Sequence, residues 1–165
     1  MKSFYRPVLF LLLFLGCGTP GSLIAQKVEY IKVPDLEKIL KNPDNKLFVV
    51  NLWATWCAPC VKELPDFEKV ARDYDGSRVK FILVSLDFLS EVDQKLLPFL
   101  KKNQISLDVA VMTDTDYDSW VRKVDKDWQG NIPSTLIFNN NKKTRYFHPG
   151  EISESELRSL ITKYL

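Results

Sequence analysis

Two short apolar runs with an amphipathic segment between them constrain the fold of this chain more than any other feature. The runs 46–53 (KLFVVNLW) and 79–87 (VKFILVSLD) are dense in Val, Ile, Leu and Phe, as expected for strands that are buried on both faces of a sheet. Between them, apolar residues recur at helical spacing and charged residues take the opposite face. The pattern predicts a strand–helix–strand unit. The apolar positions of the helix are Val61, Leu64, Phe67, Ala71 and Tyr74, and the charged ones are Lys62, Asp66, Lys69 and Arg72.

Beyond this unit the chain continues to alternate between helix-like and strand-like segments. We expect one helix that is opened by Ser90 with Asp93 and kinked or shortened by Pro98, and a last helix that is opened by Ser153 with Glu156. No repeat, linker or low-complexity stretch interrupts the pattern, which predicts one α/β domain over residues 26–165. The other expected elements are a strand over 108–112, a helical stretch over 117–124, and hairpin strands over 134–139 and 143–148.

The first 25 residues have the three-part layout of a secretory signal. Lys2 and Arg6 precede the apolar run Val8–Leu15, and small residues follow it. The run is too short to span a bilayer, which takes about 20 apolar residues. We therefore expect an exported protein, either periplasmic or anchored to the membrane on its extracytoplasmic side.

Two cleavage sites compete in this leader. Cleavage after Gly16 would leave Cys17 as the first residue, which looks like the site at which bacterial lipoproteins are cut and lipidated. Cleavage after Ala25 would leave Gln26 as the first residue of a protein without a lipid anchor. Either outcome removes Cys17 as a free thiol, so the exported domain keeps one pair of cysteines.

The charge balance excludes one class of partner. The chain has 23 basic and 21 acidic side chains, and the excess of positive charge belongs to Lys2 and Arg6 in the leader. The rest of the chain has no net charge, no basic run and no stripe of aromatic and basic residues. No nucleic-acid partner is therefore expected.

The chemistry is concentrated at Trp56–Cys60 (WCAPC), directly after a predicted strand and at the start of a predicted helix. A cysteine in the first turn of a helix meets unpaired backbone N–H groups and the positive end of the helix dipole, and both stabilise the thiolate. This makes Cys57 the predicted nucleophile. Cys60 lies one turn deeper, where its sulfur can return to bonding range, so it is the predicted resolving thiol.

Other uses of a C-x-x-C pair fit the sequence less well. A zinc site needs two more ligands, and the other candidates are Cys17 in the leader and the single histidine, His148. Covalent c-type haem needs a histidine at position 61, which is Val61. A purely structural disulfide suits an exported protein, but it does not explain the position between a strand and a helix. No metal or other cofactor is expected.

Two motifs resemble one known family. The string 51–60 (NLWATWCAPC), followed by Glu63 and Pro65, resembles the thioredoxin superfamily and in particular its TlpA/ResA-like branch of exported thiol-disulfide oxidoreductases. The segment 130–135 (GNIPST) is similar to the family's loop with a cis-proline opposite the active cysteines. The resemblance covers roughly residues 45–165, and it implies a thioredoxin-like fold with a central mixed β-sheet flanked by helices.

The resemblance also implies roles for the residues around the sulfurs. It implies a cis bond between Ile132 and Pro133, which would leave the preceding backbone exposed and ready to pair with an extended substrate segment near Cys57. Trp56 is expected at the rim of the site and Trp53 in the core. The residues implied to contact substrate are Trp56, Ala58, Pro59, Ile132 and Pro133, and those implied to support the site are Asn51, Trp53 and Pro65.

One position departs from ordinary thioredoxin. Six residues before Cys57, where ordinary thioredoxin has a buried carboxylate that serves the resolving cysteine, this chain has Asn51, which cannot titrate. Glu63 is the expected catalytic substitute, because it lies three residues after Cys60 on the same helix face and matches the acid of the family pattern W-C-x-x-C-x-x-E-x-P. Burial and neighbouring thiolates would raise the pKa of Glu63. Judged by its neighbours alone, Glu63 is equally well a solvated helix residue.

The direction of the reaction is inferred from the residues between the cysteines. Ala58-Pro59 lacks the histidine seen between the cysteines of strongly oxidising relatives, so the pair should favour reduction of substrates. The resemblance implies disulfide-containing proteins as substrates, apocytochromes before haem attachment among them, and a membrane thiol-disulfide reductase as electron donor. Three alternatives stay open: an exported disulfide oxidase or isomerase, a peroxidase of the same superfamily, and a metal-binding carrier that uses Cys57, Cys60 and His148.

Overall fold

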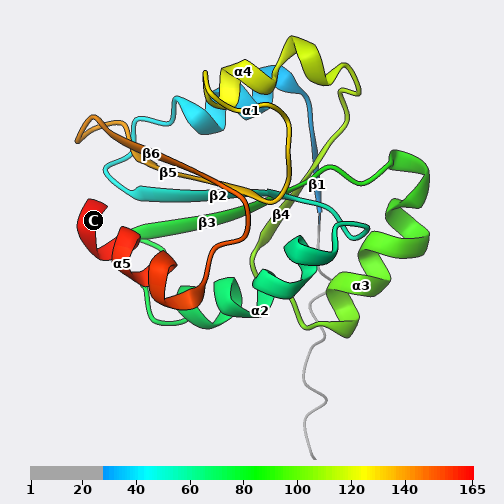
Figure 1. Cartoon of the computed structure of the whole chain (residues 1–165), viewed down its shortest axis with the longest axis horizontal. Helices are drawn as coiled ribbons and strands as arrows, with labels where there is room; N and C mark the ends of the chain where they lie inside the picture. Colours follow the sequence, from blue (N-terminus) through cyan, green and yellow to red (C-terminus); the bar gives the residue numbers. More distant parts are fainter. Residues whose placement is uncertain (1–27) are drawn as a thin grey trace, which may run out of the picture.

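The computed structural model describes residues 28–165, which form one sheet of six strands with helices on both faces (Figure 1). The strand order is β1-β4-β3-β2-β5-β6. The strands are β1 (Glu29–Ile31), β2 (Leu47–Trp53), β3 (Val79–Ser85), β4 (Asp108–Met112), β5 (Ser134–Asn139) and β6 (Thr144–Pro149). The helices are α1 (Val33–Leu40), α2 (Ala58–Ala71), α3 (Leu97–Lys102), α4 (Val121–Val124) and α5 (Glu154–Tyr164), with 3-10 turns η1 (Leu89–Glu91) and η3 (Tyr117–Ser119) and the π turn η2 (Val92–Leu96).

The predicted strand–helix–strand unit forms the centre of the sheet. β2 pairs in parallel with β3, from Leu47 opposite Val79 to Trp53 opposite Ser85, and α2 makes the connection between them. All residues of β2 are buried, because the strand has a neighbour on each side and helices on both faces. β5 runs antiparallel to β2, and β6 runs antiparallel to β5. The mixed α/β sheet expected from the sequence is therefore confirmed.

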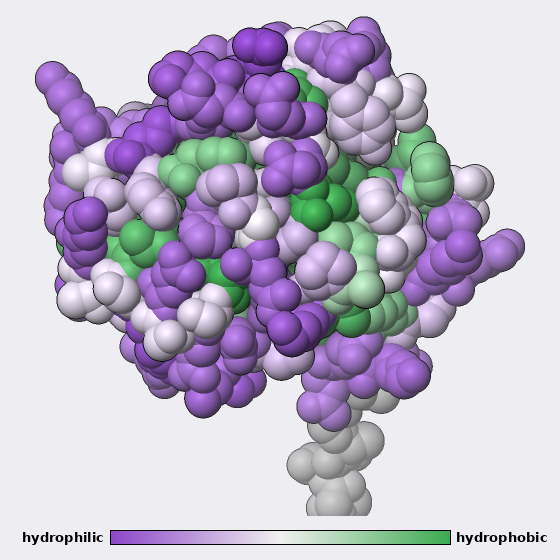
Figure 2. Space-filling model, in the orientation of Figure 1, coloured by the Kyte–Doolittle hydropathy of each residue, from purple (hydrophilic) through white to green (hydrophobic). Residues whose placement is uncertain are grey.

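Two helical layers enclose the sheet and close two hydrophobic cores. α1 and α4 cover one face, and α2, α3 and α5 cover the other (Figure 1). Because successive strand residues point to opposite faces, Val50 and Leu52 of β2 belong to the first core, whereas Val49 and Trp53 belong to the second. Figure 2 shows hydrophobic residues in the middle of the molecule, between the hydrophilic surfaces of the two helical layers. The second core contains both cysteines of the C-x-x-C motif.

The first strand and helix lie in a region for which the sequence analysis predicted no element. β1 extends the sheet by pairing in parallel with β4. α1 follows it directly, and the N–H of Val33 donates to Asp114 Oδ2 at 2.7 Å, just beyond β4. Leu36 and Leu40 bury the inner face of α1 in the first core. β1 is too short to show a hydrophobic period, so no sequence signal marked it.

One helix prediction was wrong in detail. Ser90 does not cap a helix, because it lies inside η1, where no side chain caps the turn. The α-helical part begins only at Leu97, and Pro98 lies in its first turn, where proline is tolerated. Pro98 has no N–H to offer to the carbonyl of Gln94, so the regular i→i−4 pattern cannot continue through it, and the preceding turn is the wider π turn η2.

The C-terminal hairpin and helix follow the prediction closely. β6 begins one residue later than predicted, because Lys143 has a φ of 56° and belongs to the turn. The N–H of Lys142 donates to Asn139 Oδ1 at 3.0 Å within this turn. The last helix has the predicted cap, since the hydroxyl of Ser153 accepts the N–H of Glu156 at 3.3 Å.

The predicted leader lies outside the described residues. The secretory signal over residues 1–25, both cleavage sites and the lipidation candidate Cys17 therefore stay predictions. In the part of the chain from residue 28 onward, none of the helices has the length and the apolar character needed to span a membrane.

Candidate active site

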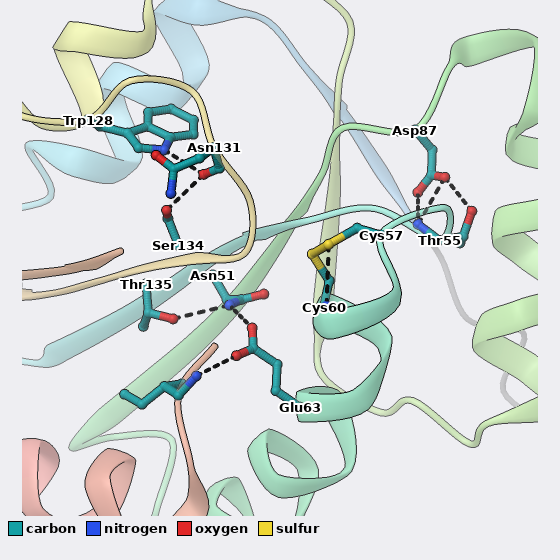
Figure 3. Close-up of a disulfide and its surroundings, with 11 residues drawn as sticks. Asn51, Thr55, Cys57, Cys60, Glu63, Asp87, Trp128, Asn131, Ser134 and Thr135 are labelled. Atoms are coloured by element: carbon teal, nitrogen blue, oxygen red, sulfur yellow. Dashed lines mark hydrogen bonds between the residues drawn. A yellow bond between two sulfur atoms is a disulfide. The ribbon is translucent and has the colours of Figure 1, made fainter. Parts of the chain in front are cut away.

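Cys57 and Cys60 lie where β2 has ended and α2 begins (Figure 3). Cys57 is the N-cap residue of α2, and its sulfur accepts the N–H of Cys60 at 3.3 Å. The two residues form a disulfide, with Cα atoms 5.3 Å apart. Cys57 is 6% exposed and Cys60 is 0% exposed. Cys57 is therefore the more accessible of the two residues, and it lies at the positive end of the helix dipole.

A buried carboxylate that the sequence analysis did not identify holds the turn before Cys57. Both oxygens of Asp87 accept the backbone N–H of Thr55 at 3.1 Å, and Oδ1 also accepts the Thr55 hydroxyl at 2.5 Å (Figure 3). The hydroxyl of Ser85 donates to Asp87 Oδ2 at 2.8 Å. These bonds tie the turn after β2 to the end of β3. One sequence signal could have identified Asp87, because it is an acid at the end of the apolar run 79–87. A charged side chain in such a buried place needs hydrogen-bond partners.

The loop before β5 contains the predicted cis peptide bond, between Ile132 and Pro133. The carbonyl of Asn131, just before this bond, accepts the hydroxyl of Ser134 at 2.8 Å (Figure 3). Ser134 is also the first residue of β5, and it pairs with Leu52 near the end of β2. The cis-proline loop therefore lies at the same edge of the sheet as the cysteines.

Glu63 lies inside the protein and is not a solvated helix residue. Only 1% of Glu63 is exposed, and its two oxygens accept the side-chain amide of Asn51 and the backbone N–H of Ile152, both at 2.8 Å. The same nitrogen of Asn51 donates to the hydroxyl of Thr135 at 3.1 Å. The network joins α2 to β2, β5 and the segment before α5 (Figure 3). Asn51 and Glu63 had been singled out from the sequence, whereas the contacts with Thr135 and Ile152 had not.

Burial raises the pKa of Glu63 from its ordinary 4.5 to about 7. The main cause is the loss of hydration of the charged form. The hydrogen bonds from Ile152 and Asn51 favour the charged form and oppose this rise, while the like charges of Glu151 and Asp66 add to it. Glu63 can therefore bind or release a proton near neutral pH. The cysteines are joined as a disulfide in this structure, so no thiolate contributes to the raised pKa.

The other predicted site residues divide into an exposed and a buried group. The segment 58–59 is exposed in the first turn of α2, and Trp56 beside it is 57% exposed. Trp53 is fully buried and packs against Phe99, with ring centroids 5.6 Å apart. Pro65 lies within α2 on its exposed side. The two tryptophans therefore have the exposures that were predicted for them.

His148 is not placed beside the cysteines. Its Nδ1 lies 3.4 Å from a carboxylate oxygen of Glu156, and its Nε2 lies 3.2 Å from the carbonyl oxygen of Glu151. Among residues 28–165, no group of three or more His, Cys, Asp or Glu residues is gathered as a metal site requires. The metal-carrier alternative therefore has no ligand set within this part of the chain.

A mixed sheet with a C-x-x-C disulfide at the start of α2 and a cis-proline loop at the same sheet edge defines the thioredoxin-like class of proteins. The chain belongs to the AhpC/TSA family, whose model matches residues 24–147. Within the thioredoxin superfamily it is a member of the ResA/TlpA-like branch, which confirms the family and the fold expected from the two motifs.

Three proteins illustrate this relationship. The thiol-disulfide oxidoreductase ResA of Bacillus thuringiensis subsp. konkukian is 32% identical over 126 residues, which are 67% of this chain and 69% of that protein. ResA of Bacillus cereus is 26% identical over 98% of this chain and 96% of its own length. The thioredoxin-related protein of Neisseria meningitidis serogroup B has a TM-score of 0.64 and 25% identity, and the match covers 75% of this chain and 88% of that one. Matches to two thioredoxins are shorter, and the chain spans 47% and 50% of their lengths.

Proposed function

We propose that this protein is an exported thiol-disulfide oxidoreductase that reduces disulfides in other proteins. The observation that carries the proposal is the Cys57–Cys60 pair at the start of α2, in which Cys57 is 6% exposed and Cys60 is fully buried. Similarity to two proteins named thiol-disulfide oxidoreductases supports it.

The proposed cycle consists of two exchange steps. In the reduced enzyme, the Cys57 thiolate attacks one sulfur of a substrate disulfide, so a mixed disulfide forms and the other substrate sulfur leaves as a thiolate. Cys60 then loses its proton and attacks the sulfur of Cys57. The Cys57–Cys60 disulfide forms, the second substrate sulfur leaves, and both substrate thiolates take up protons. The substrate gains two electrons and the enzyme loses two.

Glu63 is the proposed acceptor for the proton that Cys60 loses. Its pKa of about 7 lets it accept a proton at neutral pH and release it again when the enzyme is recharged. α2 places Glu63 three residues after Cys60, and the side chain points inward rather than to solvent. Asn51, which occupies the position of the thioredoxin carboxylate, does not ionise and so cannot take up this proton.

The surface beside Cys57 is the proposed binding site for an extended substrate segment. Trp56 offers an exposed ring, and the exposed residues 58–59 border the sulfur in the first turn of α2. The backbone of Ile132, just before the cis bond, lies at the same sheet edge and would pair with the substrate backbone, as a strand pairs with its neighbour. Pro133 itself has no N–H, and its carbonyl accepts the N–H of Gly150.

The reducing direction, the electron donor and the location belong to the same proposal. Ala58-Pro59 provides no histidine that would stabilise the thiolate and so favour the reduced enzyme. An exported reductase must be recharged in surroundings that favour disulfides, and the proposed donor is a membrane thiol-disulfide reductase. The leader, with Cys17 as its lipidation candidate, would bring the protein to that membrane. Disulfide-containing proteins, apocytochromes among them, are the proposed substrates.

Trapping of the mixed disulfide tests the roles of the two cysteines. In Cys60→Ser the resolving thiol is absent, so a protein substrate should stay attached to Cys57 and migrate with the enzyme on a non-reducing gel. Cys57→Ser serves as the control and should trap nothing. Trapping by Cys57→Ser and not by Cys60→Ser would reverse the assignment.

The reduction potential tests the direction. Equilibration with glutathione should give a value near the roughly −270 mV of thioredoxin rather than the roughly −120 mV of the strong oxidant DsbA. A potential near that of DsbA would identify an oxidase.

A further inference from the structure

A buried polar atom without a partner lies in β2, the strand that leads to the catalytic pair. Of the side-chain polar atoms buried within residues 28–165, Asn51 Oδ1, Trp53 Nε1 and Thr144 Oγ1 have no hydrogen-bond partner. Asn51 is fully buried in the middle of β2. A buried acceptor that loses water and gains no donor costs free energy. In the disulfide form, Asn51 Oδ1 therefore lacks the hydrogen-bond donor that would offset this cost.

The orientation of the Asn51 amide is determined by its neighbours. Its nitrogen donates one hydrogen to Glu63 Oε1 at 2.8 Å and the other to Thr135 Oγ1 at 3.1 Å. An ionised carboxylate can only accept, so while Glu63 is ionised the nitrogen faces Glu63 and the oxygen faces the other way. Figure 3 shows this oxygen on the side of the amide that faces α2 and Cys60.

We propose that Asn51 Oδ1 accepts a hydrogen bond from the Cys60 thiol in the reduced enzyme, directly or through one bound water. This inference rests on the proposed function, in which the pair cycles between disulfide and dithiol. In the disulfide, Cys60 has no hydrogen to donate and Asn51 Oδ1 is unpartnered. In the dithiol, the S–H group supplies the missing donor. Asn51 therefore favours the reduced state and holds Cys60 as a neutral thiol until the mixed disulfide forms.

Of the polar groups around Asn51 and Cys60, one titrates near neutral pH and the others only form hydrogen bonds. α2 contributes Glu63, and the charges of Asp66 and Glu151 lie near enough to affect its pKa. β2 and β5 contribute Asn51 and Thr135, and neither titrates near neutral pH. Asn51 thus contacts the titrating acid through its nitrogen and presents its oxygen to the buried sulfur.

A potential measurement distinguishes this role from a purely structural one. In Asn51→Leu the acceptor is gone, so the dithiol loses a hydrogen bond and the disulfide loses an unpaired oxygen. The equilibrium with glutathione should shift about tenfold toward the disulfide, which makes the potential about 30 mV more negative. A structural residue would weaken both redox forms equally and leave the potential unchanged, which would overturn the proposal.

Two further variants serve as controls for this shift. Thr144→Val removes another buried unpartnered oxygen, at the start of β6 and away from the cysteines, and should leave the potential at the parent value. The effect of Asn51→Leu is also measured in a Glu63→Gln background. If the shift persists there, Asn51 acts on the sulfur. If it vanishes, Asn51 acts only through Glu63 and the proposal is wrong.

An infrared measurement needs no substitution at Asn51. In the reduced Cys17→Ser/Cys57→Ser protein, Cys60 is the sole thiol, and its S–H stretching band should lie at or below the wavenumber of reduced glutathione in water. A band above that reference would reveal a thiol without an acceptor and would overturn the proposal. Both measurements are independent of protein substrates, so failure of the reductase proposal in the trapping experiment would be seen separately.

Discussion

Burial changes the ionisation of the Glu63 carboxyl, although its charged neighbours in the sequence suggest an ordinary solvated residue. Its neighbour Lys62 is exposed and Asp66 is half-buried, whereas Glu63 is enclosed between α2 and the sheet. Two donors at 2.8 Å stabilise its charge, but they do not replace the lost hydration completely. The resulting carboxylate is half ionised near neutral pH, and it lies three residues after the buried Cys60 in α2.

Substitution of Glu63 tests this effect on the sulfurs. Glu63→Gln removes a negative charge that disfavours a second one nearby, so the apparent pKa of Cys57 or Cys60 in the reduced protein should fall by about one unit. The rate of thiol alkylation, followed across pH, measures this apparent cysteine pKa.

A matched control lies on the same helix. Glu68 is also buried, but it accepts the N–H groups of Ser106 and Leu107 at 2.7 and 3.0 Å and belongs to a separate network. Glu68→Gln should leave the alkylation profile unchanged. Equal profiles for parent and Glu63→Gln would mean that water or another group carries the proton.

At the scale of elements, the reactive turn is held from three sides. β2 leads into it, α2 leads out of it, and the end of β3 supplies Asp87, which accepts the N–H and the hydroxyl of Thr55. The cis-proline loop is joined to the same edge through the pairing of β5 with β2. Cys57 is thereby placed by bonds between elements and not by the turn alone.

Removal of the Asp87 carboxylate should loosen this junction. Asp87→Ala leaves the N–H of Thr55 and the hydroxyl of Ser85 without their acceptor, so the free energy of unfolding should fall by about 2–3 kcal/mol. Urea denaturation of the oxidised protein measures the loss. Asp75→Ala is the comparison, because Asp75 accepts the N–H and hydroxyl of Ser77 in an exposed turn, where water can replace it. A loss at Asp87 no larger than that at Asp75 would show that the junction does not depend on the carboxylate.

At the scale of the whole molecule, two cores share one sheet, and the active site lies in the core under α2, α3 and α5. An acid buried in that core makes the stability of the entire domain depend on pH. The folded protein binds the Glu63 proton more tightly than the unfolded chain, because the pKa is about 7 in the first and near 4.5 in the second.

The sign of this pH dependence follows directly. Stability contributed by the bound proton is fully present below pH 4.5 and is lost as the pH rises through 7. From pH 5 to pH 8, the free energy of unfolding of the oxidised protein should fall by up to about 3 kcal/mol. Urea titrations at several pH values measure it, with Glu63→Gln as the variant that should lack this slope. A parent protein whose stability is constant over the range would contradict the burial of a titrating Glu63.

Local patterns in the sequence were sufficient for the strands β2 and β3, the helix between them and the cysteine pair at its start. Each depends on residues close in the chain: apolar runs predict buried strands, and the position of Cys57 before α2 follows from the motif itself. The cis bond at Pro133 was available through the family motif. β1 and the division of residues 89–102 into two short turns and one helix were not predicted, because a three-residue strand and a proline-interrupted helix have no clear period.

Contacts between distant segments were decided by the tertiary structure alone. Glu63 meets a backbone N–H 89 residues away, and Asn51 meets Thr135 at a separation of 84. The sequence identified Glu63 as a candidate acid, but its burial, its raised pKa and the unpartnered oxygen of Asn51 result from the packing of α2 between β2, β5 and the segment before α5. Hydration and hydrogen bonding depend on everything that surrounds a group in space, and a pattern of neighbours along the chain does not contain that information.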